Sequence, residues 1–270
     1  MQKSKIAKVL SVITLTMFLF TLSLVGINQV GSDLTVNSVI GVQKAEASTV
    51  SWKYIASGTP YVTKLYAIRS GVPGPVMMVV GGTHGNEEAG YLAADQIKDF
   101  KITKGILIVI PRANATAIKA GTRTSPGVYD LNRSYPQTAT GRPNDPLAAA
   151  IWQTVKDYKV QYLMDLHEGY NYHLVDSTSV GQSLIYYPTD WKSRSNGLTV
   201  VTQLNKSISI YNHRFTTFPT PVPLSLARAT SELLGVHGYT FETCDKQPLS
   251  TRINQHMSAV RTYLKILGMQ

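Results

Sequence analysis

The chain has 270 residues and a formal net charge of +10, with 43% hydrophobic and 16% charged residues. That balance excludes a disordered or coiled-coil protein, and the length allows one large domain or two small ones. A single cysteine, Cys244, excludes an internal disulfide framework and a cysteine-rich structural zinc site. The excess of cations suits anionic surroundings, such as a cell envelope or carboxylate substrates.

Residues 1–47 show the three parts of a secretory signal peptide in order. A basic start with three lysines precedes an apolar stretch at 9–27, and Ala45-Glu46-Ala47 forms a small-residue cleavage site. We therefore expect a secreted protein in which 48–270 form a single domain. The alternative is a membrane-anchored protein, because the 19 residues of the apolar stretch are long enough to span a bilayer if they are not removed.

The mature part alternates predicted strands with predicted helices. Short apolar runs bounded by glycine or proline predict buried strands, and apolar residues at helical spacing predict helices. In chain order we expect a strand at 61–69, a strand at 75–82, a helix at 86–100, a strand at 105–111, a loop at 112–145, a helix at 147–158, a strand at 160–167, a strand at 183–187, helices near 196–210 and 224–234, a strand at 238–244 and a helix at 250–267. This alternation predicts an α/β fold with a mostly parallel, mixed central sheet and helices on both faces.

Polar side chains lie at or near the carboxyl ends of three predicted strands, where sheets of this kind bind ligands. His84 and Glu87 follow one strand, His167 ends a second, and Glu242 lies in a third. His84 and Glu87 are three residues apart at the start of a predicted helix, so their side chains can point to the same side. Two imidazoles and one carboxylate, with a fourth tetrahedral position left for water, are the ligand count of a catalytic zinc site.

The H-x-x-E spacing is weak evidence on its own. A single histidine after a strand is more often a hydrogen-bonded loop residue, and the zinc motifs H-E-x-x-H and H-x-x-E-H are both absent from the sequence. The residues alone therefore leave a metal site and an ordinary hydrogen-bonded loop open as alternatives.

Four segments in a fixed order carry a resemblance to a known family. They are GGTHGNE at 81–87, DLNR at 130–133, DLHEG at 165–169 and the late apolar strand with Glu242. Together they cover about residues 75–245, nearly all of the mature chain. In this arrangement the sequence resembles the zinc carboxypeptidase superfamily, and most of all its succinylglutamate desuccinylase/aspartoacylase branch. The resemblance implies a zinc-carboxypeptidase-like fold and one zinc ion as cofactor.

The resemblance implies that the metal ligands are His84, Glu87 and His167. Asp130 matches the acid that orients the first ligand histidine. Asp165 precedes His167 by two residues and points to the same face of a strand, so it is either a second orienting acid or an ordinary hydrogen-bonded group.

The resemblance also implies the residues that bind substrate and perform the reaction. Asn132 and Arg133 match the pair that holds a substrate carboxylate, and the planar guanidinium suits a two-point carboxylate contact. Glu242 matches the catalytic glutamate, which takes a proton from water and passes it to the leaving amine. Arg123 matches the arginine that polarises the scissile carbonyl, with Arg112 as the second choice.

We therefore expect a secreted zinc-dependent hydrolase that cleaves an amide bond next to a substrate carboxylate, by metal-activated water with Glu242 as general base. The substrate is a peptide, as for a carboxypeptidase, or an N-acyl amino acid, as for a deacylase. Export, and the short stretch of 28 residues after Glu242, favour a peptide such as a cell-wall stem. The alternative is a non-catalytic secreted protein of the same fold that binds a metal or a peptide.

The sequence indicates few partners besides the substrate. Residues 48–270 hold 22 Lys and Arg against 14 Asp and Glu, and the resulting net charge of +8 suits contact with an anionic cell wall. No nucleic-acid motif is present, and nothing indicates an obligate protein partner. Cys244 is expected to be a buried small apolar residue.

Overall fold

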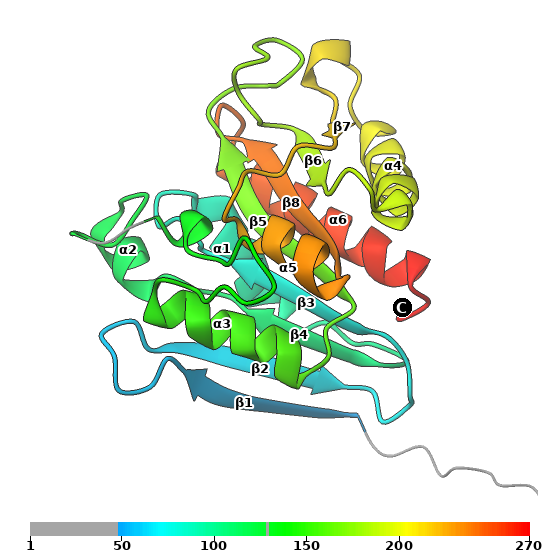
Figure 1. The fold of residues 1–270 in the computed structure, drawn as a ribbon. Helices are drawn as coiled ribbons and strands as arrows, with labels where there is room; N and C mark the ends of the chain where they lie inside the picture. Colours follow the sequence, from blue (N-terminus) through cyan, green and yellow to red (C-terminus); the bar gives the residue numbers. More distant parts are fainter. Residues whose placement is uncertain (1–47, 128–129) are drawn as a thin grey trace, which may run out of the picture. The chain divides into compact units, whose positions relative to one another are not determined.

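A mixed eight-stranded sheet forms the centre of the fold (Figure 1). The computed structural model describes residues 48–127 and 130–270, and in this part of the chain the strand order is β1-β2-β4-β3-β5-β8-β6-β7. Four neighbouring pairs are parallel and three are antiparallel, which confirms the predicted mostly parallel, mixed sheet. The strands are β1 (Thr49–Ile55), β2 (Thr63–Arg69), β3 (Val76–Gly81), β4 (Ile106–Ile110), β5 (Tyr162–Gly169), β6 (Ser183–Tyr186), β7 (Thr216–Phe218) and β8 (His237–Cys244).

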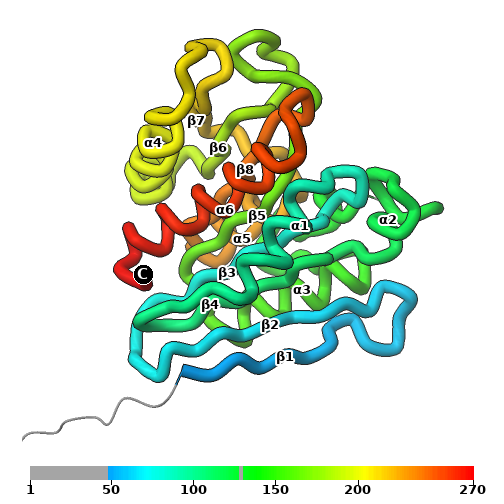
Figure 2. Tube along the Cα trace, turned by 180° about the vertical axis from the view of Figure 1, so that it is seen from behind, coloured from blue at the N-terminus to red at the C-terminus, as the bar shows by residue number. Residues whose placement is uncertain are grey.

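Helices cover both faces of this sheet, as predicted. One face packs against helices that contribute Ile97 and Val200 to a buried core, and Figure 2 shows α1 and α6 on this side. The opposite face packs against helices that contribute Ile151 and Leu226 to a second core, and α3 and α5 lie on this side in Figure 1. The helices over the first face are α1 (Glu88–Ile97), α4 (Trp191–Asn205) and α6 (Leu249–Ile266), and those over the second are α3 (Pro146–Asp157) and α5 (Leu226–Leu234).

The central strands are apolar without interruption because both of their faces are buried. In β3, Met77 and Val79 lie in the core beneath α1 and α6, whereas Met78 and Val80 lie in the core beneath α3 and α5. The edge strand β1 is the opposite case, since six of its seven residues are exposed.

The parallel strands β3, β5 and β8 bring the predicted site residues to one edge of the sheet. β3 pairs with β5 and β5 pairs with β8, so the three carboxyl ends lie side by side. His167 of β5 stands opposite Glu242 of β8 in the register. Gly81, the last residue of β3, stands opposite Leu166, so the turn that carries His84 follows at the same level.

The predicted loop at 112–145 contains a short helix, α2 (Ala115–Ala120). Asn114 starts it, because its side-chain oxygen accepts a hydrogen bond from the Ala117 N–H (3.2 Å). Gly121 ends it in the left-handed conformation with φ of 64°. The expectation of a loop throughout this stretch is therefore wrong for these six residues.

Helix α4 starts at Trp191, ahead of the predicted range 196–210. Asp190 sets this start, because its Oδ1 accepts a hydrogen bond from the Ser193 N–H (3.0 Å). The sequence patterns predict neither β1 nor β7, since β1 is exposed on both faces and β7 has only three residues. Among the described residues, no helix combines the length and apolar character needed to cross a membrane. The predicted signal peptide at 1–47 lies outside them.

Candidate metal centre

Three side chains predicted as metal ligands converge at the carboxyl edge of the sheet. One ligand-type atom from each of His84, Glu87 and His167 lies within 4.8 Å of the other two. The Glu87 carboxylate stands between the imidazoles, with Oε1 2.6 Å from His84 Nδ1 and Oε2 2.8 Å from His167 Nδ1. The two Nδ1 atoms are 3.2 Å apart. All three residues are buried.

Local backbone geometry explains how His84 and Glu87 reach this point. Gly82 turns the chain after β3 with φ of 72°, a conformation that favours glycine. At Gly85 a Cβ atom would lie 2.1 Å from the backbone of Ala117, so only glycine allows α2 to pack this closely. Glu87 is the N-cap residue that directly precedes α1, yet its side chain forms no cap hydrogen bond with that helix. Its carboxylate contacts the two histidines instead.

A second carboxylate lies next to the Nε2 atom of each histidine. His84 Nε2 lies 2.9 Å from Asp130 Oδ1, and His167 Nε2 lies 3.0 Å from Asp165 Oδ2. Thr83 donates a hydrogen bond to Asp165 Oδ1 (2.9 Å). Of the two readings of Asp165 that the sequence leaves open, the structure therefore favours the orienting acid. Carboxylates on the far nitrogens fix the imidazole rings and leave both Nδ1 atoms facing one point.

The carboxylates and imidazoles of this cluster shift one another's pKa values. Burial alone would lower the pKa of His167, but the charges of Asp165 and Glu87 outweigh it and raise that pKa well above its ordinary value. His84 behaves in the same way: burial opposes the charged form, while Glu87 and Asp130 raise its pKa. Burial would raise the pKa of Glu87, but the two histidines hold it well below the usual range.

The donor set fits a zinc ion. The acids favour positive charge at the point where the two Nδ1 atoms meet, and a divalent cation supplies that charge. Two imidazole nitrogens and one carboxylate oxygen suit zinc better than calcium or magnesium, which prefer oxygen ligands.

Glu242 lies beside the three ligands without belonging to them. It is 7% exposed, and its Oε2 has no hydrogen-bond partner among the described residues. Burial raises the pKa of Glu242 to about 8. A buried carboxyl group with a free oxygen and a pKa in this range is suited to exchange a proton near neutral pH.

Arg123 reaches the cluster, whereas the side chain of Arg112 is engaged elsewhere. Arg123 donates to Asp130 Oδ2 from Nε (3.1 Å) and Nη2 (2.9 Å), and its Nη1 lies 3.4 Å from Glu87 Oε1. Its side chain is 48% exposed, so it borders both the cluster and solvent. Arg112 pairs with Asp95 at 2.7 Å and lies over the ring of Tyr91.

Asn132 and Arg133 belong to a short 3-10 turn, η2 (Leu131–Arg133). Asp130 starts this turn by accepting the Asn132 N–H at 2.8 Å, so one carboxylate orients both His84 and η2. Asn132 is buried, and its Oδ1 accepts the backbone N–H of Leu226 (3.3 Å). The Arg133 guanidinium donates to the Asn132 carbonyl (2.7 Å) and forms no ion pair with a described residue.

Sequence reasoning does not identify the contacts of Glu168, the residue that follows His167. Glu168 accepts hydrogen bonds from the Ala89 N–H (3.0 Å) and from the hydroxyl of Thr243 (3.2 Å), and it pairs with Arg252. Its own backbone N–H donates to Glu87 Oε2 (3.2 Å). Arg252 is 84 residues further along the chain, and no local spacing signals that contact.

A family model described as the Succinylglutamate desuccinylase/Aspartoacylase catalytic domain matches residues 73–264. The curated N-alpha-acetyl-L-2,4-diaminobutyric acid deacetylase of Halomonas elongata is 31% identical over 100 residues, which are 36% of this chain and 29% of that protein. The match therefore spans less than a third of the curated relative.

Two solved structures share the fold. The mDAP-bound form of Helicobacter pylori Csd4, a D,L-carboxypeptidase, has a TM-score of 0.65 and 18% identity over 73% of this chain and 52% of its own. An aspartoacylase family protein from Mesorhizobium loti has a TM-score of 0.62 and 18% identity over 84% of this chain and 70% of its own. These likenesses confirm the predicted fold class.

Proposed function

Because the chain belongs to the succinylglutamate desuccinylase/aspartoacylase family, we propose that it is a secreted zinc-dependent hydrolase that cleaves an amide bond next to a substrate carboxylate. The family is one of deacylases with a carboxypeptidase-like fold. The observation that carries the proposal is the convergence of His84, Glu87 and His167 beside Glu242, whose Oε2 has no partner among the described residues.

In this proposal His84, Glu87 and His167 hold one zinc ion. When bound there, zinc supplies Lewis-acid activation of water and of the scissile carbonyl. Asp130 and Asp165 keep the two imidazole rings in the ligating orientation.

Glu242 is the general base and then the general acid. Its position opposite His167 in the β5–β8 register supports this role. In the ionised form it takes a proton from the attacking water, and in the protonated form it passes that proton to the leaving amine. The burial that raises its pKa makes the Glu242 carboxylate a stronger base toward the attacking water.

Three further side chains position the substrate. Arg133 binds the substrate carboxylate through its guanidinium, and Asn132 assists. Arg123 stabilises the oxygen of the scissile carbonyl as negative charge develops on it. Arg123 contacts Asp130 and Glu87 through its guanidinium, and its side chain is 48% exposed, so a substrate can reach it.

Two substrate classes fit this arrangement. The predicted export favours a peptide with a free carboxylate, such as a cell-wall stem, and the Helicobacter pylori neighbour is a D,L-carboxypeptidase. The Halomonas elongata relative removes an acetyl group from an amino acid, which favours an N-acyl amino acid. We propose the peptide first and the acyl amino acid second.

Defined substrates distinguish these classes. The purified protein is incubated with peptidoglycan stem peptides, with plain peptides and with N-acyl amino acids, each with and without a chelator, and products are identified by mass spectrometry. A peptide substrate is expected to lose its carboxyl-terminal residue, and an N-acyl amino acid its acyl group, in a reaction that the chelator stops. If no substrate is hydrolysed while zinc is bound, the alternative of a non-catalytic binding protein is correct.

Export is tested separately. The amino-terminal sequence of protein recovered from the culture medium is expected to begin at Ser48, after the predicted cleavage site. Protein that stays with the membrane and keeps 9–27 would instead support the anchored alternative.

A further inference from the structure

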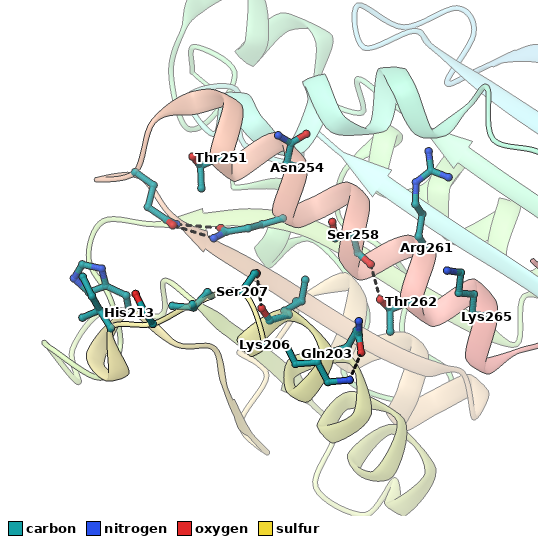
Figure 3. Close-up of a pocket in the computed structure, with 16 residues that line it drawn as sticks. Gln203, Lys206, Ser207, His213, Thr251, Asn254, Ser258, Arg261, Thr262 and Lys265 are labelled. Carbon is teal, nitrogen blue, oxygen red and sulfur yellow. Dashed lines mark hydrogen bonds between the residues drawn. The ribbon is translucent and has the colours of Figure 1, made fainter.

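A groove lies between α6 and the segment from the end of α4 to His213 (Figure 3). Its volume of about 780 Å³ is within the range of ligand-binding sites. None of the metal-centre residues described above lines it.

One polar stripe of α6 forms a wall of this groove. Its residues are spaced three and four apart, so they share one face of the helix. The stripe consists of Thr251, Asn254, Gln255, Ser258, Arg261, Thr262 and Lys265. From Thr251 to Lys265 it extends for roughly 20 Å, at about 1.5 Å per helical residue. This length suits a chain-like ligand rather than a single small molecule.

The two segments that line the groove, 203–213 and 247–265, hold four Lys and Arg and no Asp or Glu. The longer ranges 191–231 and 246–270, which contain these segments, hold nine Lys and Arg and no Asp or Glu, although Arg228 and Arg252 pair with acids outside the two ranges. The rest of 48–270 holds 13 Lys and Arg against 14 Asp and Glu, so it is nearly neutral.

Three cations of the groove have no acidic partner. Lys206 donates to the Gln203 side chain (2.8 Å), and Arg261 lies over the ring of Phe100, 3.9 Å from its centroid. Within the described part of the chain, neither these two nor Lys265 forms an ion pair, and no Asp or Glu lines the groove. All three side chains are exposed, so their charges are available to a ligand.

The lining also restricts the chemistry of the ligand. Hydroxyl and amide groups separate the cations, which suits separated anionic groups with hydroxyl groups between them. No Trp, Tyr or Phe of the described chain lines the groove, and stacking on such rings is what single-stranded nucleic acids require.

We propose that this groove binds a phosphate-bearing polyol chain. Phosphate groups pair with Lys206, Arg261 and Lys265, and the hydroxyl groups between them hydrogen-bond to residues such as Asn254 and Ser258. The groove would hold the protein on an anionic polymer of the cell envelope. This inference goes beyond the proposed hydrolysis and does not depend on it.

To test this proposal, the purified protein is titrated into fluorescently labelled poly(glycerol phosphate). The fluorescence anisotropy of the polymer is measured at low and at physiological salt. Binding is expected to weaken as salt rises, because ion pairs with phosphate are screened. The variant K206Q/R261Q/K265Q is expected to bind at least about tenfold more weakly, since each cation near an anionic surface contributes about 1 kcal/mol.

A matched control removes the same charge elsewhere. The variant K101Q/K119Q/K156Q changes three exposed lysines that do not line the groove, and its affinity is expected to change less than about twofold. The double variant K206Q/K265Q keeps the Arg261–Phe100 contact and guards against a folding defect. The variant E242Q is expected to bind as the wild type does, so failure of the proposed hydrolysis remains distinguishable.

Three results would overturn the proposal. The first is no binding by the wild-type protein, and the second is an equal loss in the groove and control variants. The third is equally tight binding of polyglutamate or single-stranded DNA, which would show that the groove accepts any polyanion.

Discussion

At the scale of single residues, the site consists of imidazoles held between carboxylates. Glu87 contacts both Nδ1 atoms, while Asp130 and Asp165 lie at the far nitrogens. Glu242 is buried beside this cluster, and its Oε2 has no hydrogen-bond partner among the described residues. A buried oxygen without a hydrogen-bond partner lowers the stability of the folded protein, and a catalytic role explains why such an atom is kept.

Replacing Glu242 by Gln tests its role as the base. We expect kcat to fall by about 10²–10⁴-fold, because an amide cannot accept the proton of water. The bound zinc per chain is expected to stay the same, since Glu242 lies outside the ligand cluster. Steady-state hydrolysis and elemental analysis measure the two quantities. Near-native turnover by the E242Q variant would exclude this residue as the base.

Replacing Arg133 by Met tests the carboxylate contact. A charge-assisted hydrogen bond contributes about 1.5–3 kcal/mol, so kcat/KM for a free-carboxyl substrate is expected to fall by roughly 10- to 100-fold. A substrate whose carboxylate is amidated serves as the control, because it lacks the group that Arg133 binds. If the variant loses as much activity on the amidated substrate, Arg133 has a structural role instead.

At the scale of elements, α6 supports the candidate metal centre through two of its side chains. Its Arg252 pairs with Glu168, next to the ligand His167, and its buried His256 lies 3.1 Å from the Thr243 hydroxyl. Burial lowers the pKa of His256 to about 3, so this ring stays neutral in the folded protein through mild acid.

His256 is expected to make stability fall in acid. Above pH 6.5 the ring is neutral in both the folded and the unfolded chain and has no effect on pH dependence. Between about pH 6.5 and pH 3 only the unfolded chain takes up the proton, so the free energy of unfolding falls by about 1.4 kcal/mol per pH unit. Urea denaturation of wild type and His256→Gln between about pH 7 and pH 5 measures this. Parallel curves for the two proteins would contradict it.

The sequence predicts the helices and strands that are specified by neighbouring residues, such as an apolar run or a helix cap. Buried strands such as β3 and β4 are uninterrupted apolar runs, and α5 begins at Ser225, whose side chain accepts the Arg228 N–H. The strand β1 is missed because its residues bury almost nothing and it forms by pairing with β2 alone.

In the candidate site too, the residues marked by local sequence are predicted, and the contacts that depend on packing are not. His84 and Glu87 are close in sequence, and His167 and Glu242 end or occupy recognisable strands, so the pattern places all four. The contact between Glu168 and Arg252 depends on how α6 packs, which no local pattern encodes. Sequence reasoning therefore finds the clustered residues and the acid Asp130, and misses the contact of Glu168 with Arg252.

At the scale of the whole molecule, the cluster of His84, Glu87 and His167 combines residues that are far apart in the sequence. His84 and Glu87 follow β3, and His167 lies in β5 more than 80 residues later in the sequence. An unfolded chain holds these groups far apart, so a metal ion held by all three would bind the folded protein preferentially. The groove along α6 lies apart from this centre and gives the molecule a second charged surface.

Zinc is therefore expected to raise the thermal midpoint. At a free concentration about 1,000 times the dissociation constant, binding adds about 4 kcal/mol to the free energy of unfolding. For a protein of this size that corresponds to roughly 8–16 °C. Differential scanning calorimetry with zinc and with chelator measures the shift. The variants His84→Ala and His167→Ala should lose most of it, and an equal shift in them would place the ion elsewhere.

The pairing of His167 with Glu242 on adjacent strands limits how this protein can be re-engineered. Adding or deleting a single residue within β5 or β8 would turn the affected side chain to the opposite face of the sheet. Designers who wish to vary chain length must therefore work in the connections, and any transplant of the reactive centre to a new scaffold has to carry both strands together in their present alignment.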